Sequence, residues 1–342
     1  MKFDFVIGNP PYQEDRQGDS NTATPVYNQF ISAAYDCADK VMLITPARFL
    51  FNAGYTPKEW NKERLNDPHF KVEAYYPNAS EVFQNVDIKG GVAITYRDLD
   101  HDFGAIEVFT VYSMLNQVFH KVFHSDGFVS LSTVVVTSFA YHFTEQMYIE
   151  NPNLVGRASK GHAYDLQSNA FDTFPEVFCS KVGHSEQYIR VLGRSGNQRC
   201  WKYIKRAYLT DVVNVDKYKV FIAKAAGIGQ FGEALPDGII GNPGDGATIT
   251  FTSIGHFNTA DEAHNCNRFI KTKFARALLG VLKVTQDLTP GKWAYVPLQD
   301  FTPSSDIDWS RSIHEIDQQL YHKYGLTDEE IAFIETHVKE MT

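Results

Sequence analysis

The stretch Phe3-Asp-Phe-Val-Ile-Gly-Asn-Pro-Pro-Tyr12 decides how the first part of this chain folds. Its apolar start predicts a short β-strand over residues 3–7. The two prolines after Asn9 fix the backbone and remove two N–H donors, so the Pro10 carbonyl is left as a free acceptor. The Asn9 side-chain oxygen is a second acceptor, and Tyr12 offers a flat aromatic face. A strand followed by this turn predicts a ligand site at the carboxyl end of a sheet.

The two acceptors suit an exocyclic amino group on a nucleic-acid base. Together they can accept both hydrogens of an NH₂ group, which keeps the lone pair of the nitrogen out of the ring and directed at an electrophile. Tyr12 can stack on the same base. The alternative is a proline-rich turn without chemistry, because a motif of four residues needs its structural context.

Outward from this motif, strand and helix patterns alternate. Residues 26–38 carry apolar side chains at helical spacing, and a second helix is expected around 57–66. Further strands are expected over residues 40–46, 70–76 and 91–96. This order predicts a parallel-type α/β sheet with crossover helices.

Beyond residue 150 the sequence changes character. Gly, Asn and Ser interrupt short apolar runs such as 219–223 and 248–252, which predicts an irregular, β-rich domain up to about residue 260. A helix is then expected over 269–282 and a strand over 293–297. Two helices close the chain, and each begins with a capping box, Ser312 with Glu315 and Thr327 with Glu330.

The net charge of −9 conceals a basic middle segment. Residues 1–150 carry 11 Lys and Arg against 19 Asp and Glu, residues 151–300 carry 18 against 13, and residues 301–342 carry 3 against 9. A basic region inside an acidic chain can bind a polyanion, although ordinary variation along a chain gives the same pattern. Its densest part interleaves cations with aromatic residues and is either a solvated face or a DNA-contacting one. The candidate DNA-binding residues are Arg194, Arg199, Lys202, Lys205 and Arg206.

Length and composition exclude several classes of protein. A chain of 342 residues is long enough for two or three domains, and 43% hydrophobic residues support a packed core. No run approaches about 18 apolar residues, and no apolar signal core opens the chain, so neither a membrane span nor a secretion signal is expected. Four scattered cysteines without a CxxC pair predict reduced thiols in a cytoplasmic protein. No metal site is expected, because His256, His264 and Cys266 lack a fourth ligand at zinc spacing.

The motif and the segments around it resemble a known family. FVIGNPPY resembles the fourth motif of class I S-adenosylmethionine-dependent amino-methyltransferases. The chain as a whole is similar to gamma-type adenine-N6 DNA methyltransferases of combined restriction–modification enzymes. The segments VYNQFISAAYD, VMLITPARFLFNAG and EVFQNVDIKGGVAITYRD resemble later elements of their catalytic sheet. Residues 249–301 resemble the end of their target-recognition domain, and residues 306–341 resemble their C-terminus.

The resemblance implies an α/β fold in three parts. These are an incomplete class I methyltransferase sheet of Rossmann-like type over residues 1–130, an α+β target-recognition domain over 131–300, and a helical tail over 301–342. It also implies that S-adenosylmethionine methylates the N6 atom of an adenine flipped out of double-stranded DNA. The residues implied to hold that adenine are Asn9, Pro10, Pro11 and Tyr12. The family places a second aromatic residue near the base, for which Phe83 and Tyr96 are candidates.

The cofactor-binding part of the family pattern is missing. In the gamma type a strand with a Gly-rich loop precedes the motif by some tens of residues, whereas eight residues precede Asn9 here. The strand at 3–7 is therefore expected to be an open sheet edge. A partner polypeptide is expected to supply the cofactor-binding half, unless the chain is a truncated product or a fragment. Residues 227–232 spell GxGxxG, but Pro236 begins a turn where a cofactor loop needs a helix.

Two other functions stay open at this point. The chain can be a non-catalytic DNA-binding or specificity module without a working cofactor site. It can also be an NPPY methyltransferase that acts on RNA or on protein glutamine, although the long recognition domain of DNA type argues against this. Cofactor binding by the isolated chain separates the enzyme from the module.

Overall fold

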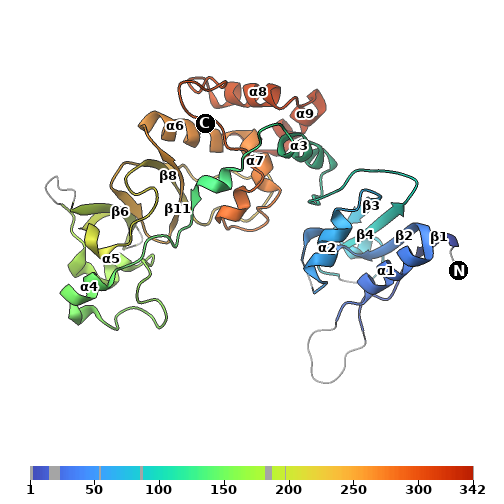
Figure 1. Ribbon diagram of the computed structural model, residues 1–342, viewed down its shortest axis with the longest axis horizontal. Coiled ribbons are helices and arrows are strands. Elements are labelled where there is room, and N and C mark those ends of the chain that lie inside the picture. The colour runs from blue at the N-terminus through green and yellow to red at the C-terminus, as the bar shows by residue number, and fades with distance from the viewer. Residues whose placement is uncertain are drawn as a thin grey trace. The chain divides into compact units, whose positions relative to one another are not determined.

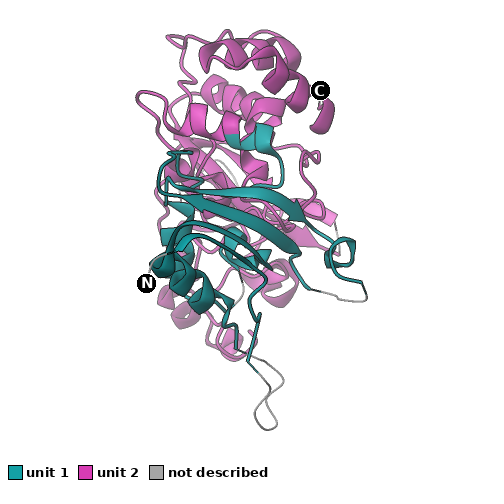
Figure 2. Ribbon diagram, turned by 90° about the vertical axis from the view of Figure 1, so that its right-hand side faces the viewer, with its two compact units in different colours: residues 1–116 teal, residues 117–342 magenta. Residues whose placement is uncertain are grey.

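The computed structural model divides the chain into two compact units, Met1–Asn116 and Gln117–Thr342 (Figure 2). It describes residues 3–14, 24–53, 55–84, 88–181, 187–196 and 198–341. The first boundary lies at 116 rather than at the expected 130, since the ring of Phe119 packs 4.7 Å from that of Tyr295 in the second unit. Residues 301–342 pack within the second unit instead of forming a part of their own. The roles expected for these parts stay predictions.

The first unit is built on a four-stranded sheet (Figure 1). Its strands lie in the order β1-β2-β4-β3, with bounds Phe3–Gly8, Ala38–Pro46, Val92–Asp98 and Phe70–Tyr76. β1 runs parallel to β2, and both β2 and β3 run antiparallel to β4. The four expected strands are confirmed, but the sheet is mixed rather than parallel throughout, because β4 is reversed.

The reversal of β4 depends on a close approach that glycine permits. Gly91, just before β4, has φ +74°, and a Cβ at this position would lie 2.2 Å from the carbonyl oxygen of Tyr76 at the end of β3. A side chain cannot be accommodated there, so the chain turns back beside β3 at this point.

Helices α1 (Tyr27–Cys37) and α2 (Lys58–Leu65) pack in the first unit, as the sequence predicts. Tyr27 and Ile31 lie one turn apart on α1 and are both buried. The ring of Phe49, which is fully buried, lies 5.4 Å from Trp60 and 6.4 Å from Phe70. This aromatic cluster joins α1, α2 and β3 in one core.

The strand β1 is an exposed edge of this sheet in the described part of the chain. It pairs with β2 on one side, and Phe3, Phe5 and Ile7 on one of its faces are 52%, 45% and 73% exposed. Three large apolar side chains in a row are unusual on a solvated edge strand. The expected open edge is therefore present in the structure.

The second unit contains two small sheets and a group of helices (Figure 1). One sheet has the order β10-β6-β7 and the other β5-β11-β8-β9. The strands are β5 (Val135–Val136), β6 (Tyr188–Ser195), β7 (Gln198–Lys205), β8 (Tyr218–Ala223), β9 (Ile239–Gly241), β10 (Asp245–Ala247) and β11 (Phe251–Phe257). The helices are α4 (Glu145–Glu150), α5 (Ala170–Thr173), α6 (Ala260–Lys271), α7 (Lys273–Gly280), α8 (Ile313–Lys323) and α9 (Asp328–His337), while α3 (Ser113–Phe123) begins in the first unit.

Buried polar contacts join the two sheets of the second unit. The ammonium group of Lys219 on β8 is fully buried and donates to the carbonyls of Val215 (2.9 Å), Asn242 (3.2 Å) and Asp245 (2.8 Å). Arg190 on β6 donates to both carboxylate oxygens of Asp245, at 2.8 and 2.6 Å. The Arg190–Asp245 ion pair lies within one sheet, whereas Lys219 reaches from β8 to the other sheet and its three donors are satisfied by carbonyl oxygens.

Three expected elements of the second unit are wrong in detail. The helix expected over 269–282 is split into α6 and α7, because Thr272 leaves the helical conformation and its hydroxyl accepts a hydrogen bond from the Ala275 amide. The strand expected over 293–297 is a 3-10 turn, Pro290–Trp293, followed by one isolated bridge. The strand expected over 248–252 lies later, at Phe251–Phe257.

Both predicted capping boxes are confirmed. In the described residues, no helix is long and apolar enough to cross a membrane.

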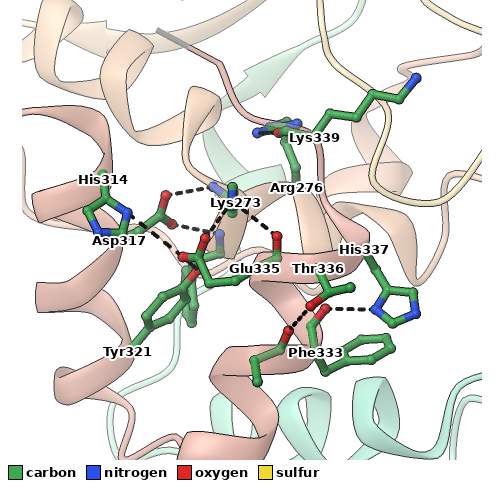
Figure 3. Close-up of polar contacts among 12 residues, drawn as sticks. Lys273, Arg276, His314, Asp317, Tyr321, Phe333, Glu335, Thr336, His337 and Lys339 are labelled. Atoms are coloured by element: carbon green, nitrogen blue, oxygen red, sulfur yellow. Dashed lines mark hydrogen bonds and ion pairs between the residues drawn. The ribbon is translucent and has the colours of Figure 1, made fainter.

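Asp317 on α8 fixes the start of α7 (Figure 3). Its carboxylate, 1% exposed, accepts hydrogen bonds from the amides of Lys273 (3.0 Å) and Phe274 (2.8 Å). Two amides that a helix start leaves unpaired are thereby satisfied. Burial raises the pKa of Asp317 from 3.8 to about 6, although both amides oppose this shift.

We expect Asp317→Asn to remove a pH-dependent part of the stability. With its pKa raised in the folded state, Asp317 contributes stability that is present below its ordinary pKa and is lost as pH rises through about 6. The free energy of unfolding of Asp317→Asn should therefore gain roughly 1–3 kcal/mol relative to wild type between pH 4 and pH 7. Urea denaturation at several pH values measures this, with the exposed Asp328→Asn as the matched control. A difference that does not change with pH contradicts the prediction.

Candidate active site and nucleic-acid interface

The strand β1 brings residues 9–12 to the carboxyl edge of the first sheet. Gly8 is the last residue of β1 that pairs with β2, and its partner there is Leu43. The motif therefore leaves the sheet beside Leu43. The motif is then tied down at its far end, since the Val26 amide donates to the Tyr12 carbonyl at 3.2 Å. The two prolines and this tie restrict the backbone between the strand and α1.

The acceptors of Asn9 and Pro10 are available for a ligand. Asn9 is exposed and Pro10 is half-buried. Among the described residues, none donates a hydrogen bond to the Asn9 side chain or to the Pro10 carbonyl. Both residues directly follow β1, and their role as acceptors for a base stays a prediction.

Tyr12 lies against Phe83, and the two residues come from different strand ends. Their ring centres are 6.4 Å apart with an interplanar angle of 67°, an edge-to-face contact. Because β1 and β3 point the same way, the segments after them meet at one edge of the sheet. The Tyr12 hydroxyl is buried without a hydrogen-bond partner in the described residues, and burial raises the pKa of Tyr12 to about 12. Tyr12 is therefore neutral at physiological pH.

Tyr96, the other aromatic candidate, makes different contacts. Its hydroxyl donates to Asp98 at 2.8 Å, and its ring stacks on Phe5 with centres 6.3 Å apart. These contacts hold Tyr96 on β4, away from Tyr12. Phe83 is thus the aromatic residue that the structure brings to the motif.

The loop Gly227–Gly232 does not fit a cofactor. The amides of Ile228 (2.9 Å) and Gly229 (3.1 Å) already donate to the Glu233 carboxylate, which also forms an ion pair with Lys283. A Cβ at Gly232 would lie 2.2 Å from the His337 carbonyl, so this glycine serves internal packing. Within the described residues, the segment Gly227–Gly232 is followed by Glu233 and irregular backbone rather than by a helix.

The basic segment of the second unit is the hairpin β6–β7, and its two ends differ. Arg194 and Arg199 lie directly opposite each other near the tip and are both exposed. The Arg199 guanidinium carbon lies 5.6 Å from the centre of the Phe251 ring. Neither side chain has an acidic partner in the described part of the chain.

The other candidate cations are held by the protein itself. Lys205 forms an ion pair with Glu150 at 2.7 Å. Arg206 donates to both carboxylate oxygens of Asp216, at 2.7 and 2.6 Å, and to Asp211 at 3.1 Å. The ammonium group of Lys202 lies 5.2 Å from the Phe171 ring. The five candidates therefore do not form one uniform patch.

Lys224 is a cation that the sequence-based set leaves out. Its amide donates to the Thr250 carbonyl at 2.9 Å, and its ammonium group lies 4.5 Å from the centre of the exposed Phe139 ring. Lys224 follows Ala223, the strand partner of Phe251, so it lies beside the residue that Arg199 contacts. Lys224 is more than twenty residues from Arg199 in the sequence, so a cluster of neighbouring cations does not include it.

The two histidines and the cysteine that were considered as zinc ligands differ in their exposure to solvent. Cys266 on α6 is fully buried, and burial raises the pKa of its thiol. His256 and His264 are exposed. All four cysteines are free thiols, as expected.

Comparison with known proteins confirms the resemblance to restriction–modification methylases for the N-terminal segment. Residues 1–83 match the model of the Eco57I restriction-modification methylase family. An uncharacterized adenine-specific methylase of Mycoplasma pneumoniae (strain ATCC 29342 / M129) is 30% identical over 95 residues, which are 27% of this chain and 22% of that protein. The chain thus matches about a fifth of the length of this curated relative. The type IIL restriction-modification enzyme MmeI, solved in complex with DNA, aligns with 98% of this chain and 56% of its own at 7% identity and a TM-score of 0.37, a likeness too weak to define a shared fold.

We expect the purified chain to bind S-adenosylmethionine only weakly, because the amides of its one GxGxxG loop are occupied by Glu233. Isothermal titration calorimetry measures this. A dissociation constant in the micromolar range that is lost in Gly229→Ala would contradict the prediction and assign the loop to the cofactor.

Proposed function

We propose that this chain carries the adenine-binding and DNA-recognition parts of an adenine-N6-specific DNA methyltransferase of a restriction–modification system. The observation that carries the proposal is the pair of unoccupied acceptors, Asn9 and Pro10, at the carboxyl end of β1 beside Tyr12. The family match over residues 1–83 supports a methylase, and the mixed α/β sheet is compatible with part of a class I methyltransferase sheet.

In this proposal residues 9–12 bind an adenine that has left the DNA duplex. Extrusion of a base costs a few kcal/mol, which the contacts of the pocket must offset. The Asn9 side-chain oxygen and the Pro10 carbonyl accept the two N6 hydrogens, and Pro11 keeps the turn rigid. The nitrogen lone pair then points away from the ring. Tyr12 stacks on the base, and Phe83 fixes the orientation of Tyr12 through its edge-to-face contact.

We propose that the cofactor is held by a polypeptide segment that covers the β1 edge. The edge offers unpaired backbone groups and the exposed side chains of Phe3, Phe5 and Ile7. Strand addition at such an edge satisfies the backbone and buries the apolar row. Methylases use S-adenosylmethionine in general, and this segment would contribute its binding loop.

A second candidate is a DNA-binding or specificity module without catalysis of its own. It is favoured by one observation, that the glycine-rich loop of the second unit binds Glu233 instead of leaving its amides free. The experiment below separates the two functions.

We expect Asn9→Ala to abolish most methylation in a complemented enzyme. The chain is produced together with a segment that carries the cofactor-binding half of a related methylase, and N6-methyladenine formation in duplex DNA is measured. Loss of one acceptor on the reacting amino group should lower the rate by about 10²–10³.

The matched control is Asn66→Ala, which removes an exposed amide at the end of α2. It should retain near wild-type turnover. Equal activity of Asn9→Ala and wild type would refute the catalytic role of the motif. No methylation by the wild-type complex, together with retained DNA binding, would favour the specificity module.

A further inference from the structure

The cations of the β6–β7 hairpin form two groups, which differ in whether an acidic side chain of the protein pairs with them. At the open end of the hairpin, Lys205 and the following Arg206 are neutralised by Glu150, Asp211 and Asp216. At the tip, Arg194 and Arg199 face each other with no acidic partner among the described residues. Like charges directly opposite each other on a hairpin destabilise it, so their placement calls for an external anion.

Two cations, Arg199 at the tip and Lys224 directly after β8, each lie over an aromatic ring. Arg199 lies over Phe251, and Lys224, next to the strand partner of Phe251, lies over Phe139. A guanidinium over an aromatic face is positioned while its N–H donors stay free. Asp172, an acidic residue near the tip, accepts a hydrogen bond from Ser195 at 2.6 Å. The side chain of Ser195 points to the face of the hairpin opposite Arg194, since neighbouring residues of a strand alternate.

The shape of the tip suits a DNA groove. β10 pairs with β6 only as far as Leu192, and beyond it β6 and β7 continue as a two-stranded antiparallel ribbon whose last pair is Ser195 with Gln198. Gly196, just after that pair, has φ +54°. Paired strands lie about 4.8 Å apart, and the major groove of B-DNA, about 12 Å wide, admits such a ribbon.

We propose that the tip of the β6–β7 hairpin enters the major groove of duplex DNA, where Arg194 and Arg199 read guanine edges and Lys224 contacts a flanking phosphate. The inference rests on the proposed DNA-binding function and goes beyond it by naming the element and the residues that determine sequence specificity. Arginine is the residue type that binds O6 and N7 of guanine with two hydrogen bonds at once. A lysine in its place keeps the charge but loses this fork.

The test compares charge-conserving and charge-removing variants of the full chain. Wild type, Arg194→Lys/Arg199→Lys and Lys224→Gln are used to select binding sequences from a randomised duplex library. Affinities for the selected site and for single-base mismatches are then measured at two salt concentrations. Arg157→Lys, which changes an exposed arginine paired with Glu176 elsewhere in the unit, is the matched control. Thermal melting confirms that each variant is folded.

Wild type should enrich a sequence that contains guanine. The double arginine variant should lose about 10- to 100-fold of its discrimination against a changed guanine, with a salt dependence close to that of wild type. Lys224→Gln should keep the selected sequence and reduce the log–log salt slope by about 0.9.

Two results would overturn the inference while the proposed function stands. One is unchanged discrimination in Arg194→Lys/Arg199→Lys, and the other is DNA binding by wild type without any enriched sequence. The absence of DNA binding by wild type even at low salt would instead remove the proposed DNA-binding function, and the inference with it.

Discussion

The parallel pairing of β1 with β2 is the constraint on which the candidate site depends. It places the end of β1 at the same sheet edge as the ends of β2 and β3, because strands that run in one direction finish together. Residues separated by about seventy positions, Tyr12 and Phe83, come into contact for this reason. The two prolines of the motif add a second constraint. They fix the backbone and lack N–H groups, so this segment cannot form a regular hydrogen-bonded turn with its own carbonyls. Without this pairing, residues 9–12 would not leave the sheet at the edge where β3 also ends.

The same pairing leaves β1 open on its other side. A row of exposed apolar residues on an edge strand promotes aggregation of an isolated protein, and in an assembly it can pair with a strand of another chain. The exposed edge and the place at which residues 9–12 leave the sheet are therefore two consequences of one strand position. The proposed partner segment and the proposed adenine contacts both depend on it.

In the second unit, several buried or half-buried charged groups form their hydrogen bonds within the protein. Lys219 joins the two sheets through the Asp245 carbonyl, and Arg190 pairs with the Asp245 carboxylate within one sheet. Asp317 accepts from the start of α7, and Glu233 accepts from the glycine-rich loop. Against this background the uncompensated arginines at the hairpin tip stand out. Both are exposed, and Arg199 lies over the ring of Phe251, which are the observations behind the proposed DNA contact.

The sequence by itself determined the local elements: β1 with its proline turn, α1, α2, the later strands of the first sheet and both capping boxes. These depend on neighbouring residues, so their signals are contiguous in the chain. The break at Thr272 combines a local cap with a distant one, because the first amides of α7 also donate to Asp317, more than forty residues away. The sequence also grouped five cations that the tertiary structure separates, because partners such as Glu150 and Asp216 become visible only when distant segments pack together. Phe83 and Lys224 acquire their neighbours in the same way. A local sequence pattern specifies the conformation of a segment. How strongly a charged or aromatic side chain interacts depends on the neighbours that the tertiary structure places around it.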